Sequence, residues 1–344
     1  MVSDMNSTTN DSLTVEIEEP LYLSLIEAGA FLLISIVGIF CNLLAFTVMI
    51  RHQSFKNAFG RLATCYTFSN IGILIIFIVW TTPWTIWMIP SGLHYINLRI
   101  GSLTIFFYQV ALHCHLFISI NRFFAITFPI RYRKMFTLYA TNVIIAFFAT
   151  ASFLYSCVYF IDGCDFFYIH SPPGWTYSME PCTQVLALYV DYYYNYFIFF
   201  VFLALDVITI VQLRSRRRKV LARQQMMNGH QAREDAKKES RELRFLAQAA
   251  LSTFTNLVLY CCGCFAVKDP RFQLLCYSLC WQLIHALAGV IFVAFNPEIR
   301  RHLPLMKRFS PGTMTAAAVS VRPVVTTTAE TNRIRIVVMK SRRK

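Results

Sequence analysis

Residues 98–127 read LRIGSLTIFFYQVALHCHLFISINRFFAIT, and this stretch decides the fold class. A helix needs about 20 mostly apolar residues to cross the roughly 30 Å hydrocarbon core of a bilayer. The stretch is long enough, and it does not alternate as the short strands of an outer-membrane barrel do. Because a backbone in lipid must satisfy its own hydrogen bonds, we predict a membrane-spanning helix here.

Six further apolar runs have the same character, and they lie at residues 28–50, 62–89, 139–161, 186–213, 245–267 and 272–295. The chain is 56% hydrophobic and 15% charged, whereas soluble domains average about 45–50% and about 25%. This composition excludes a soluble enzyme and a disordered chain, and 31 Phe in long apolar runs exclude a basic nucleic-acid-binding domain. We therefore predict an all-α membrane protein, a seven-transmembrane helix bundle, with no nucleic-acid partner.

The distribution of Lys and Arg predicts the orientation of the bundle. If the N-terminus lies outside, 29 of the 32 basic residues fall on the cytoplasmic side, and Arg99, Lys268 and Arg271 remain outside. Cytoplasmic loops of membrane proteins carry an excess of Lys and Arg. The N-terminus is therefore predicted outside and the C-terminus inside, and most of the net charge of +14 lies against the anionic lipids of the inner leaflet.

The two ends of the chain differ in composition from the apolar spans. Residues 1–20 are acidic and polar without the apolar core of a cleavable signal peptide, so we expect the first span to direct insertion. We predict an extracellular tail over 1–27, a helical domain over 28–309 and a disordered cytoplasmic tail over 310–344. Asn6 and Asn10 begin two N-x-S/T patterns and are candidate glycosylation sites, although such short patterns also arise by chance.

Two cysteines, Cys164 and Cys182, lie in the connection 162–185 on the outer, oxidising side. A disulfide between them would close a loop whose constraint is worth about 2–4 kcal/mol. Two free thiols are the alternative. The other cysteines lie in apolar spans without paired histidines at zinc-site spacing, so we interpret them as small buried hydrophobes and predict no metal site and no cofactor.

Polar and aromatic residues gather toward the outer ends of several spans. Gln109 and His113 are four residues apart and share a helix face, and Gln109 lies about 20 Å outward of Arg122 along the axis. Because few charges are present there, we predict a pocket for a small, weakly charged or neutral extracellular ligand. The alternative is a belt of aromatic residues at the membrane interface. The remaining pocket candidates are Trp84 and Trp87 from a Trp stripe with Trp80, then Asp191, Tyr192, Asn195, Trp281 and His285.

Four further polar residues occur inside or at the ends of spans, where each is costly. Asn42 and Asn70 are predicted to form hydrogen bonds between helices and so to fix packing. Asp206 lies in the inner half of the fifth span and is a structural candidate as well. Arg122 lies at the inner end of the third span, where its side chain can also extend to the interface.

The inner end of the third span resembles the signature of rhodopsin-like receptors. Asn121-Arg122-Phe123, followed by Phe128-Pro129, stands where that family usually has Asp-Arg-Tyr. Gly38-Ile-Phe-Cys-Asn42 is similar to the helix-one pattern, and Asn70 falls where the family usually has Asp. Phe295-Asn296-Pro297-Glu298 resembles the start of the short amphipathic eighth helix, which makes Asn296 and Pro297 structural candidates.

An ordered set of motifs over residues 30–305 resembles the nematode serpentine chemoreceptors of class X. The set comprises Ser54–Gly60, Asn121-Arg-Phe, Asp162–Asp165 with Trp175 and Cys182, and Leu205–Thr209 leading to Leu213-Arg214. The resemblance implies a G-protein-coupled chemosensory receptor in the plasma membrane, in the sensory cilia of chemosensory neurons, that binds a small ligand and activates a heterotrimeric G protein. The residues it implies for coupling are Asn121, Arg122, Pro129, Arg216, Arg217 and Arg218.

The chain also departs from the rhodopsin-like pattern. It has no cysteine between Cys65 and Cys114, so the usual disulfide from helix three to the second outer loop cannot form. It lacks Trp-x-Pro in helix six and Asn-Pro-x-x-Tyr in helix seven. Since Asn121 cannot ionise, Arg122 needs another restraint in a resting state.

Other functions fit the sequence less well. A transporter or ligand-gated channel is the main alternative, but no internal repeat is evident and Asp206 is almost the only mid-span acid. An intramembrane enzyme would need more clustered histidines than His113-Cys-His115, and we predict no enzyme. A retinal-binding light receptor needs a helix-seven lysine, which residues 272–295 lack.

Overall fold

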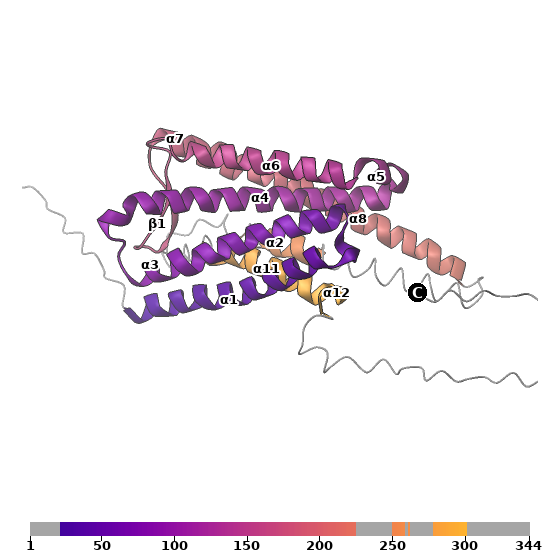
Figure 1. Cartoon of the computed structure of the whole chain (residues 1–344), viewed down its shortest axis with the longest axis horizontal. Coiled ribbons are helices and arrows are strands. Elements are labelled where there is room, and N and C mark those ends of the chain that lie inside the picture. The colour runs from indigo at the N-terminus through magenta and orange to yellow at the C-terminus, as the bar shows by residue number, and fades with distance from the viewer. Residues whose placement is uncertain (1–20, 225–249, 259–260, 262–277, 301–344) are drawn as a thin grey trace, which may run out of the picture. The chain divides into compact units, whose positions relative to one another are not determined.

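The computed structural model describes residues 21–224, 250–258, 261 and 278–300, and Figure 1 shows their long helices. The candidate glycosylation sites Asn6 and Asn10 and the predicted cytoplasmic tail lie outside the described residues. The side chains of Arg217, Arg218 and Pro297 lie outside them too.

Five of the predicted spans are confirmed as helices that are long and apolar enough to cross a membrane. The first begins at Leu21, seven residues before the predicted start at 28. The second and fifth are each continuous helices that pass through a π-helical segment. In order, the five are α1 (Leu21–Arg51), α2–η2–α3 (Ala58–Ile76, Phe77–Thr81, Thr82–Ile86), η3–α4 (Ser91–Leu93, His94–Thr127), α6 (Leu138–Val158) and α7–η4–α8 (Pro181–Val185, Leu186–Tyr194, Asn195–Gln224).

The sixth and seventh predicted spans are described in part. Residues 250–258 are helical, and α11 (Cys280–Phe295) is an apolar helix that packs against α1 and α2. After Asn296 the short helix α12 (Pro297–Arg300) begins, where the eighth helix was predicted. The short helix η1 (Gln53–Phe55) connects α1 to α2, and α5 (Pro129–Met135) connects α4 to α6. Both lie at the same end of the bundle (Figure 1).

The connection between α6 and α7 forms an antiparallel hairpin that the sequence analysis did not predict. Strands β1 (Phe166–Ile169) and β2 (Gly174–Tyr177) pair with Phe166 opposite Tyr177 and Ile169 opposite Gly174. Aromatic cross-strand pairs stabilise such ladders, and the Phe166 and Tyr177 ring centroids are 4.7 Å apart. We call this end of the bundle the hairpin end and the opposite end the α5 end (Figure 1).

Gly101 lets the hairpin lie directly against the backbone of α4. A Cβ atom at this position would be 1.7 Å from the carbonyl oxygen of Phe166. A residue with a side chain therefore cannot occupy position 101 unless β1 moves. The sequence thus places a glycine where the backbones of β1 and α4 meet this closely.

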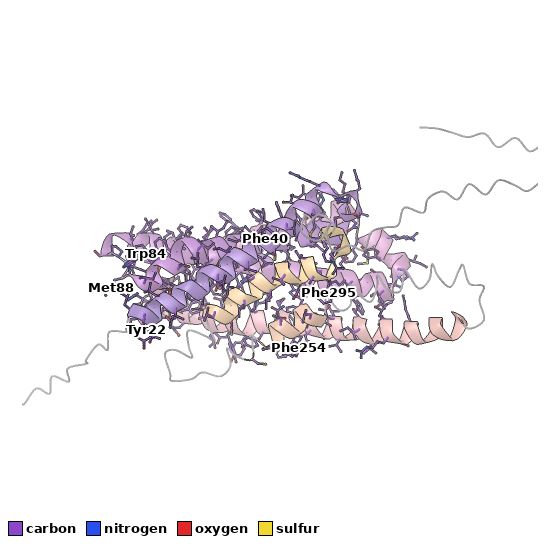
Figure 2. The ribbon with its side chains drawn as sticks, turned by 90° about the horizontal axis from the view of Figure 1, so that it is seen from below. Tyr22, Phe40, Trp84, Met88, Phe254 and Phe295 are labelled. Atoms are coloured by element: carbon purple, nitrogen blue, oxygen red, sulfur yellow. A yellow bond between two sulfur atoms is a disulfide. The ribbon has the colours of Figure 1, made fainter. Side chains whose placement is uncertain are left out.

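The outward faces of the helices carry large apolar side chains. Tyr22, Phe40 and Phe254 on helices, and Met88 in the connection after α3, are all exposed, and Figure 2 shows where they lie along the bundle. A soluble monomer rarely exposes contiguous apolar surface on this scale. The same side chains suit a bundle that is surrounded by lipid.

Candidate functional site

The carboxylate of Asp191 in η4 accepts hydrogen bonds from three tyrosine hydroxyls. The distances to Oδ2 are 3.2 Å from Tyr155 at the hairpin end of α6, 2.8 Å from Tyr159 just after α6 and 2.9 Å from Tyr177 of β2. Burial and the nearby Asp191 charge raise the pKa of Tyr177 well above its usual value, so this phenol stays protonated and donates. We call these four residues the Asp191 cluster.

Gln109 joins the Asp191 cluster from α4. Its Nε2 donates to Asp191 Oδ1 at 3.3 Å and to Asn195 Oδ1 at 3.2 Å. The Gln109 side chain is only 2% exposed, and its Oε1 has no partner. Three predicted pocket residues, Gln109, Asp191 and Asn195, thus lie in mutual contact.

Trp281 of α11 lies at the centre of a second group, of aromatic rings. Rings from α2–η2, α4, the hairpin and α11 itself surround it at centroid distances of 5.8–6.4 Å, mostly edge to face, as aromatic pairs prefer. Phe166 also contacts Tyr177, which connects this group to the Asp191 cluster. The rings of this Trp281 cluster are Phe77, Tyr108, Phe166, Trp175 and His285.

His285 ties the Trp281 cluster to the two asparagines that were predicted to fix packing. Its Nδ1 lies 2.8 Å from Asn70 Oδ1, and its carbonyl oxygen accepts a hydrogen bond from Asn42 Nδ2 at 3.1 Å. A cavity of about 20 Å³ lies beside it, lined also by Tyr108 and His115, and has room for about one water molecule. The Nε2 of His285 has no partner.

Among the other predicted pocket residues, His113 contacts Gln109 through the Gln109 carbonyl oxygen, which lies 2.6 Å from its Nδ1. The ring of His113 stacks on Phe148 of α6, and its Nε2 lies 2.7 Å from the hydroxyl of Tyr194. Tyr192 is 48% exposed. Trp87 is 62% exposed because α3 ends at Ile86 and the backbone of Trp87 is extended.

Trp84 keeps only part of the predicted Trp stripe. Its ring contacts Trp80 at 5.7 Å, and its carbonyl oxygen lies 3.0 Å from His170 Nδ1. Trp80 is buried and donates to Asn97. Trp87 does not continue the stripe. The prediction of three aligned tryptophans is therefore wrong at Trp87, and only Trp80 and Trp84 share a face.

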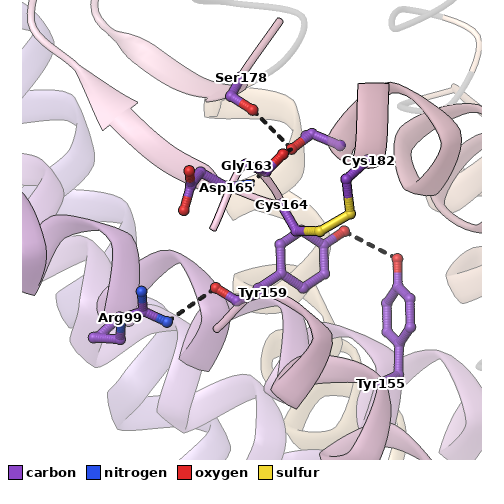
Figure 3. Close-up of a disulfide and its surroundings, with 9 residues drawn as sticks. Arg99, Tyr155, Tyr159, Gly163, Cys164, Asp165, Ser178 and Cys182 are labelled. Carbon is purple, nitrogen blue, oxygen red and sulfur yellow. Dashed lines mark hydrogen bonds between the residues drawn. A yellow bond between two sulfur atoms is a disulfide. The ribbon is translucent and has the colours of Figure 1, made fainter. Parts of the chain in front are cut away.

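The predicted disulfide between Cys164 and Cys182 is present and joins the hairpin connection to α7 (Figure 3). Beside it, Thr183 Oγ1 accepts from the backbone amide of Asp165 at 2.7 Å and donates to the carbonyl of Gly163 at 2.9 Å. Arg99 of α4 donates to the carbonyl oxygen of Tyr159 at 3.0 Å, as Figure 3 shows. The disulfide and these bonds hold Tyr159 and the hairpin in place.

Several residues of the site were not predicted from the sequence. Tyr155 and Tyr159 are four apart at the end of a span and therefore share a face, which is a signal that was available. Tyr177 and Trp175 lie two apart in what proved to be a strand. Their partners depend on tertiary packing, which no local pattern specifies.

At the α5 end, Arg122 borders a second cavity of about 20 Å³, together with Tyr66, His115 and Ser252. Its Nε has no partner, and its guanidinium lies 5.5 Å from the centre of the Phe59 ring. The neighbouring Asn121 is buried and donates to the hydroxyl of Tyr132 in α5 at 3.4 Å.

Three further predicted residues lie at this end of the bundle. Pro129 begins α5, and Arg216 is exposed on α8. Figure 1 shows α8 running past the ends of its neighbours here. Asn296 is buried where α11 ends and α12 begins.

Comparisons with known proteins agree with this architecture. Squid rhodopsin matches with a TM-score of 0.68 over 85% of this chain and 87% of its own, at 12% identity, which shows a common fold. Serpentine receptor class X 45 from Caenorhabditis elegans is 25% identical over 286 residues, 77% of each chain. Serpentine receptor class X-43 from the same organism is 28% identical over 221 residues, 60% of this chain and 64% of its own.

The family resemblance predicted from the motifs is confirmed by a family model that spans most of the helical bundle. The model for the serpentine type 7TM GPCR chemoreceptor Srx matches residues 32–296, which is more than half of the chain. The chain therefore belongs to the Srx family of seven-transmembrane G-protein-coupled chemoreceptors.

Proposed function

We propose that this receptor binds a small molecule at the Trp281 cluster, from the outer side of the plasma membrane, and activates a heterotrimeric G protein on the inner side. One observation supports this location for the ligand. Buried polar atoms normally have hydrogen-bond partners, yet several in or near the Trp281 and Asp191 clusters have none. These atoms are Gln109 Oε1, Trp175 Nε1, Ser278 Oγ, Gln282 Oε1 and His285 Nε2.

The same atoms support a ligand that is neutral or weakly charged. The indole N–H of Trp175 is a donor, and the amide oxygens of Gln109 and Gln282 are acceptors. The Asp191 carboxylate is already bonded to three tyrosines and to Gln109, so it is not available to pair with a cationic ligand. A compound with an apolar body and one or two polar groups matches these aromatic rings and unpaired polar atoms.

The α5 end supports contact with a cytoplasmic partner. Exposed cations lie on α5 and on the part of α8 at the α5 end, the end of the bundle where Arg122 also lies. Ligand binding would favour a state in which the α5-end parts of α8 and the 250–258 helix separate, because a ligand shifts an equilibrium toward the state that it binds better. The exposed cations are Arg131, Arg133, Lys134, Arg214 and Arg216.

The test is a panel of odorants applied to cells that express the receptor with different Gα subunits, with a calcium or cyclic-nucleotide signal. We then expect ligand-dependent nucleotide exchange with purified components, weakened by Arg122→Ala. Arg51→Ala, an exposed cation at the same end of the bundle, is the matched control. A ligand response that persists without any Gα subunit contradicts the proposal. Ion flux through purified receptor in liposomes would favour the transporter or channel alternative.

A further inference from the structure

Three contacts define how α4 and α8 lie beside each other. Gln109 meets Asn195, the His115 ring stacks on Phe202 at 4.4 Å, and Thr127 Oγ1 donates to Gln212 Oε1 at 2.5 Å. The residue numbers in these pairs differ by 86, 87 and 85, so the two helices run parallel in a fixed register.

This register places Asp206 close to the level of Arg122. The residues of α8 level with Arg122 are 207–209, and Asp206 is one to three positions away, which is about 1.5–4.5 Å along the axis. The Asp206 carboxylate and the Arg122 guanidinium interact electrostatically. Two opposite charges on neighbouring helices thus lie at levels that differ by less than one helical turn along the helix axes.

Both groups also face the 250–258 helix. Asp206 is 1% exposed, and its Oδ2 accepts a hydrogen bond from Thr253 Oγ1 at 2.5 Å. Arg122 borders the cavity whose wall includes Ser252, the neighbour of Thr253. Asp206 Oδ1 and Arg122 Nε have no hydrogen-bond partner. Each group therefore retains hydrogen-bonding capacity for the other or for a water between them.

His115 and Tyr66 complete the surroundings of this pair. Both line the cavity beside Arg122, and Asn256 Nδ2 lies 3.4 Å from His115 Nδ1. His115 interacts electrostatically with Asp206 and with Arg122, so it responds to both charges. An isolated charge in this setting is costly, and removal of one member of a buried pair leaves the other uncompensated.

We propose that Asp206 is the positioning residue for Arg122, the counter-charge that holds its guanidinium inside the bundle in the resting receptor. This inference rests on the proposed coupling to a G protein. Asp206 supplies the negative charge that Asn121 cannot, and Thr253 links the pair to the helix that must move. Displacement of the 250–258 helix removes the Thr253 hydrogen bond from Asp206 and releases Arg122 toward the cytoplasmic partner.

The experiment measures two properties of full-length receptor in lipid nanodiscs without ligand. The first is nucleotide exchange on Gα, and the second is deuterium uptake over residues 250–258 with no G protein present. For Asp206→Asn we expect a rise in both, with exchange increased about fivefold or more, the lower part of the usual range of coupling between sites. Asp206→Glu keeps the charge and should stay near the unmodified receptor.

Two more variants separate charge from packing. Thr253→Val removes the hydroxyl and leaves Asp206 in place, so we expect nucleotide exchange and deuterium uptake to rise, but less than in Asp206→Asn. If Asp206→Asn does not fold, Thr253→Val tests the inference in its place. Thr209→Val is the matched control, because Thr209 is buried on α8 and bonds only to the carbonyl of Leu205 in its own helix. The double variant Asp206→Asn with Arg122→Ala should lose the raised exchange.

The outcomes distinguish failure of the inference about Asp206 from failure of the proposed G-protein coupling. Unchanged exchange and uptake in Asp206→Asn and Thr253→Val, in a receptor whose ligand still drives exchange, overturn the inference alone. An Asp206→Glu variant as active as Asp206→Asn also overturns it, because charge is then irrelevant. Raised uptake in Asp206→Asn, with no exchange on any Gα even when ligand is present, supports the positioning role and contradicts the proposed coupling.

Discussion

Asn97 of α4 binds both backbone polar groups of Tyr168 in β1. Its Nδ2 donates to the Tyr168 carbonyl oxygen at 2.8 Å, and its Oδ1 accepts from the Tyr168 amide at 3.2 Å. The same Oδ1 accepts from Trp80 Nε1 at 2.8 Å. The side chain thus extends the edge of β1 as a strand would. It attaches the hairpin to α4, the helix that lacks the outer-end cysteine usual in rhodopsin-like receptors.

Replacement of Asn97 by Ala should destabilise the receptor and weaken its ligand response. Three buried groups, on Tyr168 and Trp80, lose their partner, and each unsatisfied group costs about 1–3 kcal/mol. The melting temperature of purified receptor measures the effect. Thr104→Val is the control, since Thr104 is buried on α4 but bonds locally to Ile100. Equal melting temperatures for the two variants would refute a tethering role.

Gly101→Ala should displace the hairpin. The added methyl group would lie 1.7 Å from the Phe166 carbonyl oxygen, and overpacking of this kind costs about 1–3 kcal/mol or more. A lower melting temperature and a weaker ligand response are expected. Gly92→Ala is the matched control, because a Cβ at position 92 meets nothing within 4 Å. Comparable losses in both variants would point to a general intolerance of alanine.

Tyr177→Phe should lower stability through the Asp191 cluster. It removes one of three hydroxyl donors to Asp191, and hydrogen bonds to charged groups contribute about 1.5–3 kcal/mol. Thermal unfolding of purified receptor is the measurement. Tyr193→Phe, at an exposed position in η4, should have little effect. A Tyr177→Phe receptor as stable as the Tyr193→Phe receptor would show that the cluster adds nothing.

Trp281→Phe should raise the concentration of active compound needed for a response by about tenfold, which corresponds to about 1.4 kcal/mol. The smaller ring leaves some of the five ring contacts of Trp281 incomplete. Trp87→Phe should leave the response unchanged because Trp87 is exposed. If the aromatic residues form only an interfacial belt, the two dose–response curves shift alike.

Hydropathy and length were enough to predict five helices that the structure describes in full, because span length is fixed by bilayer thickness. The Trp stripe failed for a local reason. Its spacing assumes 3.6 residues per turn, but Trp80 lies in the π-helical η2, and the helix ends before Trp87. Trp80 and Trp84 remain in contact, so it is the end of the helix at Ile86 that separates Trp87 from the stripe, and hydropathy does not reveal this end.

The candidate site was predictable in its residue types and less so in its partners. The sequence pointed to Gln109, Asp191 and Asn195 because a polar side chain in an apolar span is energetically costly and usually has a structural or functional role. Their tyrosine partners come from the end of α6, the residue that follows it and β2, which lie apart from Asp191 in the sequence and meet it only in the tertiary structure. Asn97 was missed because its contacts with Tyr168 and Trp80 depend on the same tertiary arrangement.

The hydrogen-bonded tether between Asn97 and β1 has a consequence for how fast the hairpin can move. Loops and lids open and close within microseconds to seconds, whereas uncatalysed disulfide rearrangement takes minutes to hours. Because hydrogen bonds attach β1 to Asn97 of α4, this attachment can open on the faster timescale, with no change in redox state and with the Cys164–Cys182 disulfide intact.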